Sequence, residues 1–229
     1  MVEGTPIIDA ARQEFEQSRA SFLPATEVED EFGIGREDFI SYAHDSLPEN
    51  DISFDQLRKL FVRRRSVRWY QDKKVPRELV EKALAIASLA PSACNRQPYR
   101  FHYCDRPGKI AKIAGSAGGA AGFADNLPAI IAIVGDLSSY PKERDRHLIY
   151  VDGSLAAMQL MLALQTLGLA SCSINWPDAR KNELRIPKVI DLKDYERVVM
   201  LMAVGYADDA GGIPYSRKKP PNLLIKDVN

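Results

Sequence analysis

Four arginines and one serine stand within the eight residues RRRSVRWY, at positions 63–70. A guanidinium group keeps its charge at any physiological pH and can give a phosphate two parallel hydrogen bonds. The stretch therefore predicts a grip for one phosphate, made by Arg64, Arg65, Ser66 and Arg68. A solvated basic helix end and a nucleic-acid-binding patch are the alternatives.

The charge balance of the whole chain bears on these alternatives. Its 31 basic and 31 acidic residues give a formal net charge of zero, whereas a nucleic-acid-binding domain is usually basic. We therefore expect no nucleic-acid partner, and the local cations indicate a small anionic ligand.

A second stretch, APSACNRQPYRF at residues 90–101, concentrates polar side chains between two prolines. Ser92, Asn95 and Gln97 lie in a connection that the prolines at positions 91 and 98 stiffen. Amide side chains carry donors and acceptors together, which suits the edge of a heterocyclic ring. A purely structural turn is the alternative.

Two weaker candidates follow later in the chain. In CSINWPD, residues 172–178, the backbone near Ile174 and Asn175 is expected to meet a flat ligand, with Trp176 beside it. The alternative is a strand end with a packing tryptophan. In PYSRKKP, residues 214–220, Arg217 is a further candidate cation, and the alternative is a solvated basic run.

Other kinds of site have little support. The histidines stand apart, at positions 44, 102 and 147, and the three cysteines have no metal-ligand spacing, so no metal site is expected. The Gly- and Ala-rich stretch 114–123 does not match the dinucleotide-binding fingerprint and is expected to be a mobile loop. No acid–base pair stands out, so catalytic side chains stay unassigned.

Location can also be predicted. No apolar run approaches the roughly 18 residues of a membrane span, and the N-terminus shows no secretory signal. Three scattered cysteines argue against a disulfide framework. These features predict a cytoplasmic protein with no membrane contact and with buried, reduced thiols.

Helices and strands alternate along the chain, which favours helices covering a mixed sheet. Ser53 and Gln56 have the spacing of a capping box, Pro76 suits a first helical position, and Gly168 suits a helix end. We expect helices over residues 6–20, 53–64, 75–91, 108–115, 144–167 and 179–185, and strands over residues 99–104, 129–136, 170–176 and 197–207. The length suits a domain over residues 53–229 with an N-terminal extension, residues 1–52.

Taken together and in order, the four polar stretches resemble the nitroreductase family of FMN-dependent oxidoreductases. The resemblance covers about residues 53–220, and the first two motifs form its specific part. The motifs are RRSVR (64–68), PSACNRQPY (91–99), GLASCSINW (168–176) and SR (216–217).

The resemblance implies an α+β fold, an interlocked homodimer, and FMN bound at the interface between the two chains. It implies that NADH or NADPH reduces the flavin, which then reduces a small acceptor such as a nitroaromatic or a quinone. The site residues follow by analogy. Arg64, Arg65, Ser66 and Arg68 hold the phosphate and part of the ring; Pro91, Ser92 and Asn95 reach the partner's flavin; Gln97 supports their loop; the backbone of Ile174 and Asn175 approaches flavin N5; and Arg217 returns to the phosphate.

The sequence also departs from the family pattern. Tyr99 stands where tryptophan is common, and Trp176 is expected to narrow the space over the flavin. Other reactions on this fold therefore stay open: reductive dehalogenation, dehydrogenation of a heterocycle, or flavin binding without turnover.

Overall fold

The computed structural model describes residues 44–228. The chain separates between Asp51 and Ile52, and the described residues before that point hold one short 3-10 helix, η1 (His44–Ser46). The expected helix over residues 6–20 lies outside the described residues, and the assignment of residues 1–52 as an extension stays a prediction.

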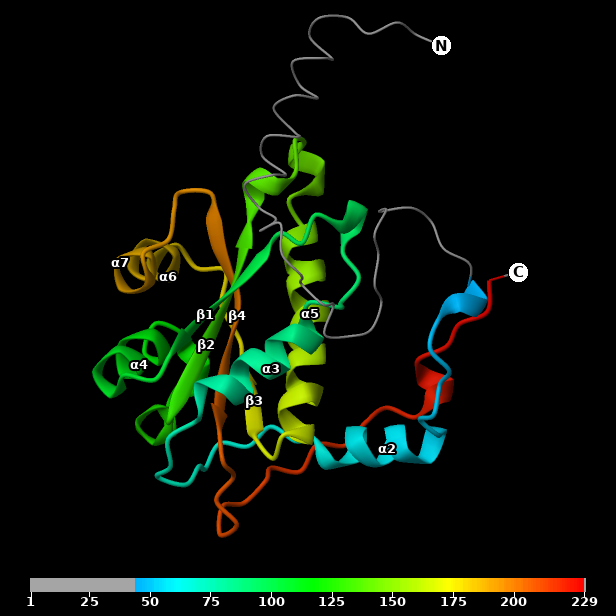
Figure 1. The fold of residues 1–229 in the computed structure, drawn as a ribbon. Coiled ribbons are helices and arrows are strands. Elements are labelled where there is room, and N and C mark those ends of the chain that lie inside the picture. Colours follow the sequence, from blue (N-terminus) through cyan, green and yellow to red (C-terminus); the bar gives the residue numbers. More distant parts are fainter. Residues whose placement is uncertain (1–43, 229) are drawn as a thin grey trace, which may run out of the picture. The chain divides into compact units, whose positions relative to one another are not determined.

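From Ile52 onward, helices and strands alternate as the sequence predicted, which confirms an α+β fold (Figure 1). Short 3-10 helices lie in the connections. The helices are α2 (Phe54–Arg63), α3 (Arg77–Ala87), α4 (Pro107–Ala114), α5 (Leu148–Thr166), α6 (Arg180–Arg185) and α7 (Pro187–Ile190), and the strands are β1 (Tyr99–Cys104), β2 (Ala129–Asp136), β3 (Ala170–Ile174) and β4 (Glu196–Gly205).

Within residues 52–228, these four strands form one sheet in the order β1-β2-β4-β3. All three strand pairs are antiparallel. The parallel part of the expected mixed sheet is reduced to a single bridge between Ser66 and Ser171, because residues around Ser66 run beside β3 without forming a full strand.

Helices cover both faces of the sheet (Figure 1). The side chains of β2 alternate between the faces, as expected for a strand buried on both sides. Ile131 and Ile133 pack with α3 and α5, whereas Ile130 and Val134 pack with α4 and the α6–α7 pair. The three layers place α5 along the centre of the sheet.

Helix α5 is apolar on nearly all sides, and by length and composition the stretch Glu143–Thr166 is sufficient for a membrane span. This corrects the expectation that no stretch of the chain is long and apolar enough to span a membrane. In the structure, however, the helix packs along the sheet, and half of its most apolar window is buried. The acidic residue Asp152 lies on the buried face. The helix therefore acts as a core element.

Local signals in the sequence are confirmed in detail at two helix ends. Ser53 and Gln56 form the capping box of α2, and Gly168 follows the end of α5 with a φ of +77°, a conformation that favours glycine. Pro76 is the N-cap of α3 and not its first helical residue.

The Gly- and Ala-rich stretch is the main error in the predicted elements. It was expected to be a mobile loop, yet Ala117, Ala120 and Phe123 are buried in the core beside α4. The stretch packs beside the end of β3, where an added Cβ at Gly119 would lie in ordinary contact, 3.6 Å from Ile174.

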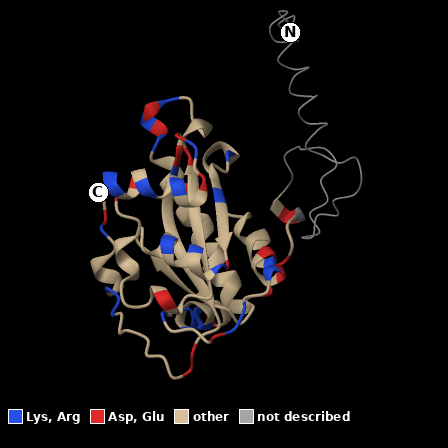
Figure 2. Ribbon diagram, turned by 90° about the vertical axis from the view of Figure 1, so that its left-hand side faces the viewer, with Lys and Arg blue, Asp and Glu red and all other residues tan. Residues whose placement is uncertain are grey.

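Positions of Lys and Arg and positions of Asp and Glu both occur in many parts of the described chain (Figure 2). A surface that favours nucleic acid has a continuous basic patch. That the chain has no nucleic-acid partner stays a prediction.

The contact between β2 and α5 generates a prediction. At Gly135, an added Cβ would lie 2.6 Å from the Cβ of Ile149, too close for the two elements to keep their spacing. We expect Gly135→Ala to lower the free energy of unfolding by about 1–3 kcal/mol, the usual cost of overpacking. Urea denaturation measures this change.

Gly108 provides the matched control, because it lies in helix α4 with no atom near its missing Cβ. Gly108→Ala should leave stability unchanged or slightly raised. Equal destabilisation by both substitutions would contradict the close packing of α5 on β2.

Candidate functional site

The arginine stretch is held in place by its backbone. The Val67 N–H donates to the Ser171 carbonyl of β3 over 3.2 Å, and the Asp208 N–H donates to the Trp69 carbonyl over 3.0 Å. The buried Tyr70 donates its hydroxyl to the Val67 carbonyl over 2.7 Å, and burial raises its pKa, which keeps it a donor. Residues 64–70 are thus fixed between β3 and the segment after β4.

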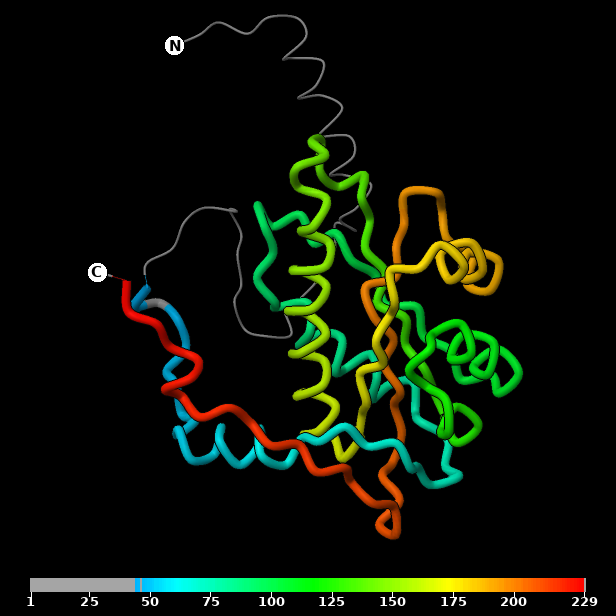
Figure 3. The backbone as a smooth tube through the Cα atoms, turned by 180° about the vertical axis from the view of Figure 1, so that it is seen from behind, coloured from blue at the N-terminus to red at the C-terminus, as the bar shows by residue number. Residues whose placement is uncertain are grey.

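The segment after β4 completes a hollow beside the arginines. It runs alongside α2 (Figure 3), and together the two stretches enclose about 300 Å³. The lining residues are Arg64, Arg65, Ser66, Arg68, Ile213, Pro214, Tyr215, Ser216 and Lys218. The structure therefore brings the first and the fourth polar stretches of the sequence together.

The hollow concentrates positive charge. Four cations line it, and no carboxylate is among its lining residues. Within the part of the chain that the structure describes, none of these four cations forms an ion pair. Arg64, Arg65 and Arg68 are half-buried, where water screens their mutual repulsion less than at an open surface. Such a site favours an anion.

A cation of the C-terminal stretch that the sequence analysis did not single out lines the hollow, and the role of Arg217 stays a prediction. Lys218 and Ser216 line the hollow, and the ammonium of Lys218 donates to the Ser216 hydroxyl over 2.8 Å. The predicted Arg217 lies between them in the chain, is exposed, and does not line the hollow.

The second polar stretch forms a tight loop between α3 and β1. Cys94, Asn95 and Gln97 have φ values of 54°, 51° and 48°, a left-handed conformation that costs about 1–2 kcal/mol for each residue other than glycine. The amide of Gln97 donates to Asn95 Oδ1 over 3.1 Å, as expected for a residue that supports the loop. Asn95 itself is exposed at the loop surface.

Ser92 points into the molecule. Its hydroxyl donates to the buried Asp152 of α5 over 2.7 Å and accepts the Gln97 N–H over 2.7 Å. Both partners belong to this chain. The structure therefore places Ser92 as a support of the loop, whereas Pro91 and Asn95 are exposed.

Within one chain, the two main stretches lie at opposite ends of α5 (Figure 1). The loop binds Asp152 in the second turn of the helix, and the arginine stretch bonds to Ser171, just after the helix ends. The 15 residues from Asp152 to Thr166 are separated by 14 helical rises, which span about 20 Å. One chain thus keeps these two groups of side chains apart.

The third stretch lies at the end of β3. Ile174 is buried and Asn175 is exposed, next to the loop that carries Gly119. Trp176 was expected to narrow the space over a flat ligand. Its side chain instead packs in the core, and its indole N–H donates to Glu183 of α6 over 2.5 Å. The indole N–H therefore links the end of β3 to α6.

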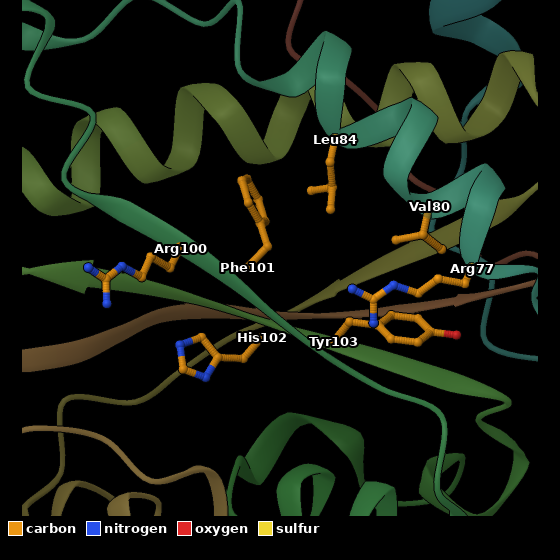
Figure 4. Close-up of a pocket in the computed structure, with 7 residues that line it drawn as sticks. All are labelled: Arg77, Val80, Leu84, Arg100, Phe101, His102 and Tyr103. Carbon is orange, nitrogen blue, oxygen red and sulfur yellow. The ribbon is translucent and has the colours of Figure 1, made fainter. Parts of the chain in front are cut away.

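A second hollow, of about 350 Å³, lies along the edge strand β1 (Figure 4). Its cations already have partners. Arg77 pairs with Glu81 over 2.8 Å and lies over the Tyr103 ring, and Arg100 pairs with Glu196 over 3.6 Å. Burial lowers the pKa of His102, so its ring stays neutral. This hollow is a weaker anion site than the one beside Arg64.

No cluster of potential metal ligands occurs among residues 44–228. All three cysteines are free; Cys104 and Cys172 are buried, as expected, but Cys94 is exposed in the strained loop. Burial raises the pKa of the Cys172 thiol although the nearby Arg68 acts to lower it.

Comparison with known proteins places this geometry in a family. The model of the nitroreductase family matches residues 62–121 and 115–206, which is more than half of the chain. The chain belongs to the nitroreductase family. Both specific motifs lie inside the matched part.

Individual relatives extend the likeness. A protein of Archaeoglobus fulgidus assigned as an NADH dehydrogenase/NAD(P)H nitroreductase is 28% identical over 68% of this chain and 87% of its own length. Human iodotyrosine deiodinase 1 is 24% identical over 82% of this chain and 75% of its own. The solved structure of an FMN-dependent nitroreductase from Clostridium difficile R20291 matches with a TM-score of 0.64 and 25% identity, over 74% of this chain and 98% of that one.

Three residues that contact the predicted stretches were missed from the sequence: Asp152, Tyr140 and Lys218. One signal was available, because Asp152 is an acidic residue within an otherwise apolar helix, LIYVDGSLAAMQLMLAL. A buried carboxylate requires several hydrogen-bond donors. The sequence does not show which residues donate, because Ser92 and Tyr140 approach Asp152 only in the folded chain.

Proposed function

We propose that this protein is an FMN-dependent oxidoreductase that takes hydride from NADH or NADPH and passes the electrons to a small organic acceptor, such as a nitroaromatic or quinone. The observation that carries the proposal is the hollow with four unpaired cations, within the described residues, in a chain of the nitroreductase family. We also propose that the protein is located in the cytoplasm, where reduced nicotinamides are available.

The donors around the hollow fit the phosphate end of FMN. Guanidinium groups of Arg64, Arg65 and Arg68, the hydroxyl of Ser66 and the ammonium of Lys218 are all donors that suit a dianion. A volume of about 300 Å³ is at the lower limit for a whole small-molecule site. The hollow thus fits one end of the cofactor, and the ring requires further surface.

When bound, FMN supplies the chemistry of hydride transfer. The residues of this chain hold and orient it: the cations neutralise the phosphate, and the peptide groups near Ile174 and Asn175 are proposed to face the ring. No side chain of this protein needs to donate or accept the transferred hydride. This agrees with the sequence, in which no acid–base pair stands out.

We also propose that two chains form the site. The loop at Pro91 and Asn95 lies about 20 Å along α5 from the arginines of its own chain, so the loop is proposed to meet the flavin held by the other subunit. Exposed apolar side chains support a homodimer, because a surface of this kind marks an interface. They are Phe54, Leu57, Phe61 and Val62 of α2, Tyr150, Val151 and Leu155 of α5, and Leu223, Leu224 and Ile225 of the C-terminal segment.

Reductive dehalogenation is a second candidate function. The observation that favours it is the similarity to human iodotyrosine deiodinase 1, which covers 82% of this chain. The two candidates share the fold and the phosphate grip and differ in the second substrate. Bound flavin that neither nicotinamide reduces would favour the dehalogenase.

The visible absorption spectrum of the purified protein tests the proposal first. We expect flavin absorption bands that bleach when NADH or NADPH is added without oxygen, and the faster nicotinamide identifies the reductant. If the protein shows no flavin bands and takes up no FMN when FMN is added, the proposed function is wrong.

Arg68 allows a test of the phosphate grip. Its guanidinium lines the hollow and lies 5.8 Å from the Phe123 ring, which fixes its position. Removing one charge-assisted hydrogen bond costs about 1.5–3 kcal/mol, so Arg68→Ala should weaken FMN binding roughly 10-fold to 100-fold in a fluorescence titration.

Arg63→Ala is the control for this measurement. Arg63 carries the same charge in the last turn of α2, is exposed, and does not line the hollow. Its substitution should change FMN affinity less than about twofold, since exposed charges contribute little. If Arg68→Ala protein keeps its full flavin complement after long dialysis, Arg68 does not hold the phosphate.

Sedimentation equilibrium tests the homodimer. Wild-type protein should have twice the mass of the chain, and Leu155→Arg should dissociate it by placing a charge on the exposed face of α5. Leu184→Arg on α6 is the control, because Leu184 is also exposed but belongs to the opposite helical layer. A monomeric wild-type protein with full FMN affinity would contradict the two-chain site.

A further inference from the structure

The carboxylate of Asp152 accepts from three donors in two segments, the loop at Ser92 and Ala93 and the residue Tyr140. The hydroxyl of Ser92, the N–H of Ala93 and the hydroxyl of Tyr140 donate to it over 2.7, 3.0 and 3.0 Å. All three bonds end on the same oxygen, Oδ2. Asp152 is 2% exposed, and within the described residues it forms no ion pair. Hydrogen bonds alone therefore balance a buried charge.

The network reaches beyond the atoms that touch the carboxylate. The single proton of the Ser92 hydroxyl points to Asp152, which leaves an oxygen lone pair for the Gln97 N–H at 2.7 Å. Gln97 in turn donates to Asn95 over 3.1 Å. The acceptor oxygen on α5 thus sets the direction of the bonds that close the loop.

The loop requires such support. Cys94, Asn95 and Gln97 all adopt the left-handed conformation, and a strained backbone persists only where the surroundings over-determine it. Tyr140 provides a second link, because burial and its bond to Asp152 raise its pKa to about 12 and keep the hydroxyl protonated. Arg96 also lies over the Tyr140 ring and donates to the Ser139 carbonyl.

We propose that Asp152 is a positioning residue, whose buried carboxylate holds the loop at residues 92–97 in its strained form and so places Asn95 for contact with the flavin. The identity of the ligand rests on the proposed function, whereas the effect on the loop does not. Asp152 is not expected to touch the cofactor.

Two substitutions separate the carboxylate's role from simple packing. Asp152→Ala removes the acceptor and leaves three donors without their partner. Asp152→Asn keeps an oxygen that can occupy the position of Oδ2, since all three bonds meet at one atom, and should restore most of the loop's order. Leu160→Ala is the control, because Leu160 is fully buried two turns along the same helix and has no contact with the loop network.

Cys94 offers a direct probe of the loop. It is the exposed cysteine, while Cys104 and Cys172 are buried, so a trifluoromethyl thiol label will attach to it selectively. Fluorine NMR of the labelled full chain then reports the loop's conformation without any flavin. FMN affinity is measured in parallel on the unlabelled proteins by fluorescence titration.

We expect one narrow resonance for the wild type and a broadened or second resonance for Asp152→Ala, with FMN binding weakened about tenfold because the loop is no longer preorganised. Asp152→Asn should stay close to the wild type in both measurements, and Leu160→Ala should show a lower unfolding midpoint with an unchanged resonance. If Asp152→Ala does not fold, Tyr140→Phe, which removes one donor, should show the same change in smaller degree.

The proposal is overturned if Asp152→Ala, or Tyr140→Phe in its place, leaves both the resonance and the affinity at wild-type values. It is also overturned if Leu160→Ala changes the resonance as much. A changed resonance with unchanged affinity for FMN would overturn the link between the loop and the cofactor. A wild type that binds no FMN would refute the proposed function, and the resonances alone would then decide the role of Asp152 in the loop.

Discussion

The packing of α5 on the centre of the sheet is the contact on which the rest of the structure depends. Glycines make the close approach possible: Gly135 of β2 lies against Ile149, and Gly153 of α5 lies against Val199 of β4. One end of α5 holds the loop at Ser92 through Asp152, and the other end leads into β3, which holds the arginine stretch at Ser171. The length of a single helix therefore sets the separation of the loop and the arginine stretch within one chain.

Much of the fold was predictable, because it is encoded in local patterns. The apolar run of β2, the capping box at Ser53 and the glycine after α5 each act within a few residues, and the structure confirms them. The arginine stretch was also recognisable, since its charge density differs from that of a neutral chain.

The errors arose where long-range packing decides the outcome. Residues 114–123 were predicted to form a mobile loop, yet their small side chains fill the space between α4 and β3. Trp176 was predicted to lie beside a flat ligand, but its side chain is buried and its indole N–H donates to Glu183. Whether residue 217 or 218 faces the hollow depends on how the C-terminal segment rotates beside α2, and no local pattern specifies that rotation.

The cations beside Ser66, which form no ion pair with any residue that the structure describes, have an energetic consequence for the protein. The hollow of about 300 Å³ is lined by four cations, Arg64, Arg65, Arg68 and Lys218. With no anion in the hollow, these cations repel one another. The repulsion weakens the contact between the C-terminal segment and residues 64–68. Dissolved salt relieves this repulsion, because the screening length falls from about 30 Å at 0.01 M ionic strength to about 10 Å at 0.1 M. A dianion bound in the hollow would relieve it from within, as an internal counterion, and the stability of the protein would then depend less on ionic strength.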